Sequence, residues 1–170
     1  MDEVRRIDRI HRVWSPVQSG VALASALIWA LFPRTPVILW IAPTAHMLLF
    51  YFLAGGTNRT NPANLISLVR IVGTASAFFF QQSLLDRWVV LVILLSAAEL
   101  FDWVDGRVAA RIGPTGFGKL FDEEADAFFI LTASALLVRT EIFGPWILSF
   151  AALRYVFIGF FGLFPDRDVF

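Results

Sequence analysis

Four aspartates at helical spacing are the strongest chemical signal in this chain. With three small residues they form one pattern: Asp102, Asp105, Gly106, Ala109, Gly118, Asp122 and Asp126. At about 100° per residue, the first four share one face of a helix and the last three share a face of the next helix. Because the turn at 111–116 is short, we expect the two faces to oppose each other and the four carboxylates to converge.

A group of carboxylates without histidine or cysteine suits a hard cation. Oxygen ligands favour Mg²⁺, with Mn²⁺ and Ca²⁺ as alternatives. Such an ion commonly leaves coordination open for a substrate phosphate, which indicates phosphoryl or pyrophosphate chemistry. The small residues would let a ligand approach the backbone closely, although small residues are equally common where membrane helices pack.

Several nearby charges have two interpretations each. Glu99, one turn deeper on the first aspartate face, either supports the ion from outside its ligands or bonds a neighbouring helix. Arg70 and Arg154 fall inside apolar segments, where they either bind a substrate phosphate or pair with a carboxylate or snorkel. Lys119, which precedes the second aspartate pair, either reaches a phosphate or is one more cytoplasmic basic residue.

Other polar residues have simpler interpretations. Glu123 and Glu124 lie off the aspartate face near the start of their helix, so we interpret them as stabilised by the helix dipole. His46 stands alone in an apolar helix, which is typical of a packed, hydrogen-bonded histidine.

The composition predicts a membrane protein. Of the 170 residues, 58% are hydrophobic and 16% are charged, with a mean hydropathy of +0.70. A soluble domain of this size could not bury so much apolar side chain. The formal net charge of zero argues against a nucleic-acid partner, and the lack of cysteine excludes disulfides, thiol catalysis and Cys-ligated zinc.

Short Pro, Gly and polar turns divide the chain into about six transmembrane helices of an all-α, polytopic bundle. The expected spans are residues 17–32, 37–53, 63–80, 87–110, 116–138 and 143–163. Residues 1–16 are Arg-rich with apolar residues on one stripe. They predict either a cytoplasmic, amphipathic interfacial segment or a simple basic anchor.

Basic residues near the helix ends predict the orientation. If the N-terminus is cytoplasmic, nine of them lie on that side: Arg5, Arg6, Arg9, Arg12, Arg59, Arg107, Arg111, Lys119 and Arg167. Three lie on the other: Arg34, Arg87 and Arg139. This bias predicts a multi-pass membrane protein whose aspartates open to the cytoplasm.

The aspartate region resembles the signature of the CDP-alcohol phosphatidyltransferase family, D-x-x-D-G-x-x-A-R-x8-G-x3-D-x3-D. All seven residues of the pattern match its fixed positions. Ala110 stands where the signature has Arg, which follows here as Arg111, and the loop to the next glycine is one residue shorter. A second stretch, NPANLISLVR, is similar to the family's P-N-x-x-T-x-x-R opening, with Ala63 inserted and Ser67 in place of Thr.

The resemblance implies a reaction and its partners. A CDP-activated lipid would place its pyrophosphate on Mg²⁺ or Mn²⁺, and a small alcohol acceptor would displace CMP. The implied metal ligands are Asp102, Asp105, Asp122 and Asp126, and Asp126 is also the implied general base. The nucleotide would lie against Gly106, Ala109 and Gly118, with Arg70, Arg111, Lys119 and Arg154 as possible phosphate contacts. A homodimer is also implied.

The resemblance assigns residues 61–164 to a catalytic core and leaves two accessory spans at 17–54 in front of it. The family core usually has six helices, whereas here three follow the helix that carries the second motif. Either the front pair takes the place of the missing pair, or the chain is a shortened form of a longer parent.

Two other functions fit parts of the pattern. An intramembrane prenyltransferase also binds Mg²⁺ and pyrophosphate through aspartates, but usually on a larger bundle with its acidic motifs far apart in sequence. A non-catalytic cation-binding bundle or transporter subunit is the second alternative. The acceptor alcohol stays open among glycerol phosphate, inositol phosphate, serine, ethanolamine and choline.

Overall fold

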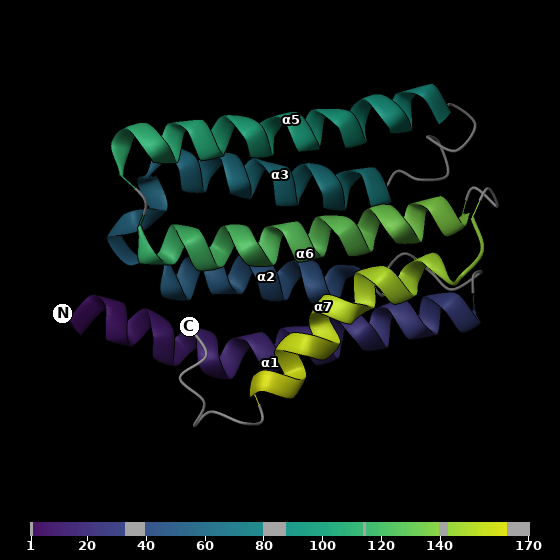
Figure 1. Cartoon of the computed structure of the whole chain (residues 1–170), viewed down its shortest axis with the longest axis horizontal. Coiled ribbons are helices and arrows are strands. Elements are labelled where there is room, and N and C mark those ends of the chain that lie inside the picture. The colour runs from purple at the N-terminus through teal and green to yellow at the C-terminus, as the bar shows by residue number, and fades with distance from the viewer. Residues whose placement is uncertain (1, 33–39, 80–87, 114, 140–142, 163–170) are drawn as a thin grey trace.

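The chain forms a bundle of helices (Figure 1). The computed structural model describes residues 2–32, 40–79, 88–113, 115–139 and 143–162. The helices in these ranges are α1 (Asp2–Leu31), α2 (Ile41–Ala54), the 3-10 helix η2 (Gly56–Thr60), α3 (Pro62–Phe79), α5 (Trp88–Ile112), α6 (Gly116–Arg139) and α7 (Ile147–Gly162). Helices α5, α3, α6, α2 and α1 run roughly side by side, and α7 crosses α1 (Figure 1).

The predicted all-α fold is confirmed, since the described residues contain helices and no strand. The expected spans at 63–80, 116–138 and 143–163 correspond within a few residues to α3, α6 and α7. Within the described ranges, however, no helix combines the length and the apolar character needed to cross a bilayer.

Helix α1 runs without interruption past residue 16, where the sequence suggested the end of a separate segment. Pro16 lies inside this helix, although proline has no N–H for the carbonyl one turn earlier. The Arg-rich segment and the first expected span therefore form one helix of 30 residues.

The start of α3 is capped by its own sequence. The Ala63 N–H donates to Asn61 Oδ1 at 3.0 Å, and Pro62 occupies the first helical position, where its missing N–H costs little. This capped start places the second motif at the end of the bundle where α5 stops and α6 begins (Figure 1).

The turn between α5 and α6 depends on a glycine and a threonine. Gly113 has a φ of 91°, in the left-handed region that favours glycine, and its N–H donates to the Ala109 carbonyl at 3.0 Å. At the start of α6, the Gly118 N–H donates to Thr115 Oγ1 at 2.9 Å. This turn brings the two halves of the aspartate pattern to the same region of the bundle.

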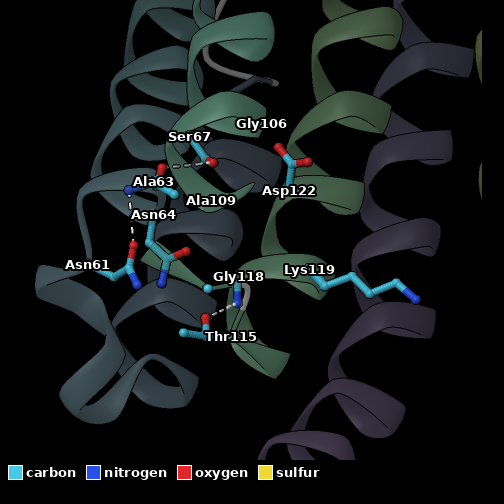
Figure 2. A pocket seen from close by; sticks show the side chains of 11 residues that line it. Asn61, Ala63, Asn64, Ser67, Gly106, Ala109, Thr115, Gly118, Lys119 and Asp122 are labelled. Atoms are coloured by element: carbon cyan, nitrogen blue, oxygen red, sulfur yellow. Dashed lines mark hydrogen bonds between the residues drawn. The ribbon is translucent and has the colours of Figure 1, made fainter. Parts of the chain in front are cut away.

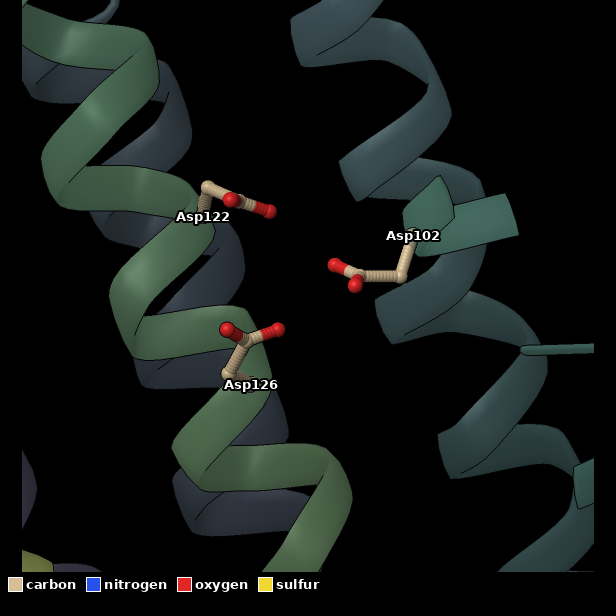
Figure 3. Close-up of side chains that lie close together, drawn as sticks. All are labelled: Asp102, Asp122 and Asp126. Atoms are coloured by element: carbon tan, nitrogen blue, oxygen red, sulfur yellow. The ribbon is translucent and has the colours of Figure 1, made fainter. Parts of the chain in front are cut away.

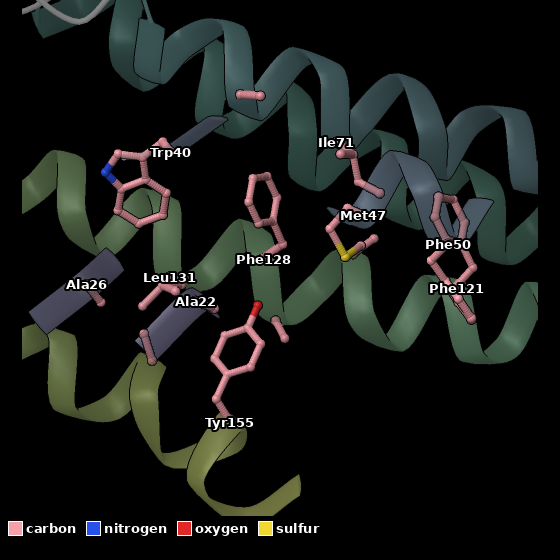
Figure 4. Packing of buried hydrophobic residues seen from close by; sticks show 14 of the residues in the cluster. Ala22, Ala26, Trp40, Met47, Phe50, Ile71, Phe121, Phe128, Leu131 and Tyr155 are labelled. Atoms are coloured by element: carbon pink, nitrogen blue, oxygen red, sulfur yellow. The ribbon is translucent and has the colours of Figure 1, made fainter. Parts of the chain in front are cut away.

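An aromatic core packs against α6 (Figure 4). Its largest fully buried side chains are Trp29, Trp40, Tyr155, Phe50, Phe117, Phe121, Phe128, Met47, Ile71, Leu131 and Leu136. Phe117 and Phe121 stack with ring centroids 5.3 Å apart. The core packs one side of α6 against neighbouring helices. The aspartates of α6 lie on its other side, toward α3 and α5.

His46 is packed and hydrogen-bonded, as the sequence predicted. Its ring stacks on Trp14 with centroids 5.0 Å apart, and its Nδ1 lies 2.8 Å from Gln18 Oε1. These contacts tie α2 to α1.

Candidate active site

Three of the four aspartates come together between α5 and α6. One carboxylate oxygen from each of Asp102, Asp122 and Asp126 lies within 4.8 Å of the others. Figure 3 shows Asp102, from α5, pointing toward the two aspartates of α6. The side chain of Asp105 lies outside the described part of the structure, so its role as a ligand stays a prediction.

Arg70 of α3 stands among these carboxylates. One terminal nitrogen lies 2.7 Å from Asp126 Oδ1 and 3.0 Å from Asp122 Oδ1, and the other donates to Asp102 Oδ1. The arginine side chain is only 3% exposed, whereas each carboxylate side chain is about 40% exposed. Of the two interpretations of Arg70, pairing with carboxylates is present in the structure, and one guanidinium links three helices.

The three carboxylates fit a divalent cation. Oxygens bound to one such ion lie within roughly 5 Å of each other, because metal–oxygen distances are about 2.0–2.6 Å. The guanidinium of Arg70 already places positive charge among them. When all three acids are ionised, two negative charges remain unmatched, which suits Mg²⁺ or Mn²⁺.

A pocket of about 200 Å³ adjoins this group (Figure 2). Its lining joins the two sequence motifs: Asn61, Ala63, Asn64, Ser67, Gly106, Ala109, Gly113, Thr115, Gly118, Lys119 and Asp122. All three small residues expected at the nucleotide therefore face one cavity. Asp122 belongs both to this pocket and to the carboxylate group.

The glycines of the pocket act in different ways. A Cβ on Gly118 would lie 2.5 Å from Asn64 Oδ1 and 2.8 Å from Thr115 Oγ1, so only glycine lets α6 start this close to α3. At Gly106 a Cβ would meet nothing within 4 Å. The missing side chain at Gly106 therefore leaves open space rather than a close contact.

Asn64 is a pocket residue to which sequence reasoning assigned no role. It is buried, and its Nδ2 donates to the Asn58 carbonyl at 2.8 Å, which fixes the direction of the amide. Figure 2 shows it beside Gly118. The signal that could have identified it was its place in the second motif, three residues before Ser67.

The remaining predicted residues lie around the site rather than in the carboxylate group. Lys119 lines the pocket, but its side chain extends away from the other labelled residues in Figure 2. Arg111 and Glu99 are exposed on α5, and Arg154 is partly buried on α7. Phosphate contacts by these basic residues and ion support by Glu99 stay predictions.

Glu124 differs from its sequence interpretation. It is 1% exposed, and it accepts a hydrogen bond from Ser15 Oγ at 2.7 Å. Its Oε1 also lies 3.2 Å from His11 Nε2. The helix-dipole interpretation is therefore wrong for Glu124, which binds α1, while Glu123 is exposed.

Comparison with known proteins identifies one family. The family model described as CDP-alcohol phosphatidyltransferase matches residues 60–168, which is more than half of the chain. The match includes the pocket, Arg70 and the aspartates, and begins after α2. No match was found among curated proteins or solved structures.

Proposed function

Because this chain belongs to the CDP-alcohol phosphatidyltransferase family, we propose that it moves a phosphatidyl-type group from a CDP-activated lipid to a small alcohol, with release of CMP. One observation carries the proposal: the pocket that joins the two motifs is lined in part by Asp122, which also belongs to the carboxylate group. A nucleotide in the pocket would then have its phosphates next to Arg70 and the aspartates.

The pocket residues would bind and orient the nucleotide. Gly106 leaves open space for close approach of the nucleotide to the backbone of α5, Ala109 adds only a small side chain, and Gly118 lets α6 begin close to Asn64 at the edge of the pocket. Lys119 at the pocket lining is a candidate to donate to a phosphate. Arg111 of α5 and Arg154 of α7 are candidates from the sequence. The terminal nitrogens of Arg70 already pair with the carboxylates, so Arg70 would contact a phosphate only where the phosphate reaches the carboxylate group.

The reaction moves one proton and exchanges one phosphorus–oxygen bond. The acceptor hydroxyl oxygen bonds to the lipid-side phosphorus, the bond from that phosphorus to the CMP oxygen breaks, and CMP leaves with the electron pair. Asp126 would take the hydroxyl proton, and Arg70, 2.7 Å away, would hold this carboxylate in place. Mg²⁺ or Mn²⁺, held by Asp102, Asp105, Asp122 and Asp126, would offset charge on the pyrophosphate.

The proposal includes a bilayer location with the site on the cytoplasmic side. Large apolar side chains are exposed on several helices, among them Val13 of α1, Leu100 of α5 and Phe150 of α7. Since the chain has no cysteine, single cysteines introduced at Arg5 and Glu123 can report sidedness. Both should react with a membrane-impermeant thiol reagent in inside-out vesicles and stay unlabelled in right-side-out vesicles.

Labelled donors separate the proposed reaction from its alternatives. Purified protein is incubated with CDP-dioleoylglycerol, Mg²⁺ and a panel of alcohols, and released CMP is measured. Pyrophosphate release from a prenyl pyrophosphate would favour a prenyltransferase, and no release from either donor would favour a non-catalytic bundle. Glu123→Gln, which changes an exposed acid on α6, is the matched control for aspartate variants.

Light scattering in detergent tests the proposed homodimer.

A further inference from the structure

Tyr51, near the end of α2, contacts both the 3-10 helix η2 and the first turns of α6. The residue is buried, at 3% exposure, and its hydroxyl donates to the Arg59 carbonyl of η2 at 2.6 Å. The centroid of its ring lies 6.0 Å from that of Phe117 and 5.1 Å from that of Phe121, both on α6. The family match begins at residue 60, so this contact comes from an accessory helix.

The position of η2 depends on contacts from outside the segment. It spans only five residues, and the Asn58 N–H donates to the Gly55 carbonyl at 2.8 Å. The Arg59 Nε donates to the Gly56 carbonyl at 3.0 Å. These bonds shape the turn, but 3-10 bonds have poor geometry and do not fix where the turn sits. The bond from Tyr51 fixes η2 relative to α2.

The Asn58 carbonyl links η2 to the pocket. It accepts the Asn61 N–H at 3.1 Å and Asn64 Nδ2 at 2.8 Å. Because Asn58 holds the amide nitrogen, Asn64 Oδ1 is turned toward Gly118, where it would lie 2.5 Å from an added Cβ. Asn64 and Gly118 both line the pocket and lie beside each other in Figure 2. A shift of η2 would therefore move a side chain of the pocket wall.

We propose that Tyr51 is a positioning residue for the nucleotide. Its hydroxyl holds η2 so that Asn58 keeps the Asn64 amide turned toward the pocket, and its ring holds the start of α6 opposite. The inference rests on the proposed function and makes an accessory helix part of the support of the nucleotide pocket. These hydrogen bonds involve neither Arg70 nor the aspartates, so Tyr51 acts on nucleotide binding and not on the transfer step.

Tyr51→Phe is the narrowest change, because it removes the hydroxyl and keeps the ring against Phe117 and Phe121. Tyr155→Phe on α7 is the matched control. Tyr155 is also buried, but its hydroxyl has no hydrogen-bond partner in the part of the chain that the structure describes. Both variants remove one hydroxyl from a core tyrosine, and only the first removes a bond to η2.

The test measures CDP binding to the full chain in detergent by titration calorimetry with Mg²⁺ present. We expect Tyr51→Phe to weaken CDP binding about threefold to tenfold, the usual effect of one lost hydrogen bond, and Tyr155→Phe to leave it unchanged. The KM for CDP-dioleoylglycerol should rise by a similar factor, while kcat for CMP release stays near the wild-type value. A merely structural tyrosine would lower the melting temperature and leave the dissociation constant of the folded protein unchanged.

Asn64→Ala tests the route from Tyr51 to the pocket. If Tyr51 acts through Asn64, adding Tyr51→Phe to Asn64→Ala should cause little further loss of CDP binding. If the two losses multiply, the route through Asn64 is rejected. An unchanged dissociation constant for CDP in Tyr51→Phe, or an equal loss in Tyr155→Phe, would overturn the positioning role.

The same measurements separate this inference from the proposed function. If the protein binds CDP but releases no CMP, the proposed transfer fails, and a selective loss of CDP binding in Tyr51→Phe still supports the positioning role. If CMP is released and Tyr51→Phe changes neither the CDP dissociation constant nor KM, the positioning role alone fails. A wild-type protein that binds no CDP contradicts both.

Discussion

The two faces of α6 use acidic residues in different ways. Asp122 and Asp126 lie toward α3 and α5, are each 39% exposed, and contact Arg70. Glu124 lies toward α1, is buried, and bonds Ser15 and His11. Because residues two positions apart point to nearly opposite sides of a helix, Glu124 has different surroundings from Asp122 and Asp126.

Both faces carry carboxylic acids. The faces differ in how exposed these acids are to solvent and in which residues they contact. The carboxylates of the open face pair with the guanidinium of Arg70 and stay partly exposed beside a pocket. Both hydrogen-bond partners of Glu124, Ser15 and His11, come from α1, a helix outside the family match. We therefore infer that the open face binds ligand and that the closed face holds the accessory helix against the core.

The largest expected effect is removal of the divalent ion from the open face. Excess chelator should abolish CMP release, and added Mg²⁺ or Mn²⁺ should restore it, because CMP is a poor leaving group when the negative charge on its phosphate is not offset by a cation. Asp105→Asn should also abolish release by removing one anionic ligand. CMP release is titrated against free Mg²⁺, and full turnover in chelator would reject the metal site.

Substitution of Asp126 should distinguish the proposed general base from the metal ligands. Asp126→Asn should lower CMP release by about 10²–10⁴-fold because an amide cannot take the proton, while CDP-lipid binding stays measurable. Asp102→Asn and Asp122→Asn should instead weaken metal-dependent nucleotide binding. Binding isotherms measured beside turnover assays decide between the roles. Near wild-type turnover in Asp126→Asn would show that Asp126 is not the base, and nucleotide binding lost as fully as in Asp122→Asn would leave Asp126 a metal ligand only and place the base elsewhere.

Glu124→Ala should mainly affect stability. It leaves the buried Ser15 hydroxyl and the His11 ring without their partner, which should lower the free energy of unfolding by about 3 kcal/mol. The folded fraction should still release CMP, because the aspartates and Arg70 are untouched. Denaturant unfolding in detergent, followed by helical circular dichroism, measures the loss, and unchanged stability would contradict a structural role for Glu124.

The smallest expected effect comes from replacing one of two glycines that line the pocket, Gly118 of α6 or Gly106 of α5. Gly118→Ala should destabilise by about 1 kcal/mol and weaken nucleotide binding, since its Cβ would press on Asn64 and Thr115. Gly106→Ala should weaken binding without lowering the melting temperature, because its Cβ has free space. Thermal melts with and without CDP distinguish the two, and identical melting temperatures would contradict the close contact at Gly118.

Local patterns predicted the elements of the site well. Aspartates three or four residues apart share a face on any helix, so the acidic stripes of α5 and α6 were readable from spacing. The caps at Asn61 and Thr115 likewise depend on neighbours two or three residues away. The short turn after Gly113 then explains why Asp102 and Asp122 meet, as expected.

What the sequence determined by itself is the helical fold, the family signature and the shared faces of the aspartates, because each depends on residues close together in the chain. Only the tertiary structure placed Arg70 among carboxylates 32 and 52 residues away, and joined Ser15 to Glu124 across 109 residues. An arginine in an apolar helix has several compensating partners available, and a glutamate's position on a helix does not reveal what covers it. Those choices depend on which helices pack together, and this requires the whole bundle.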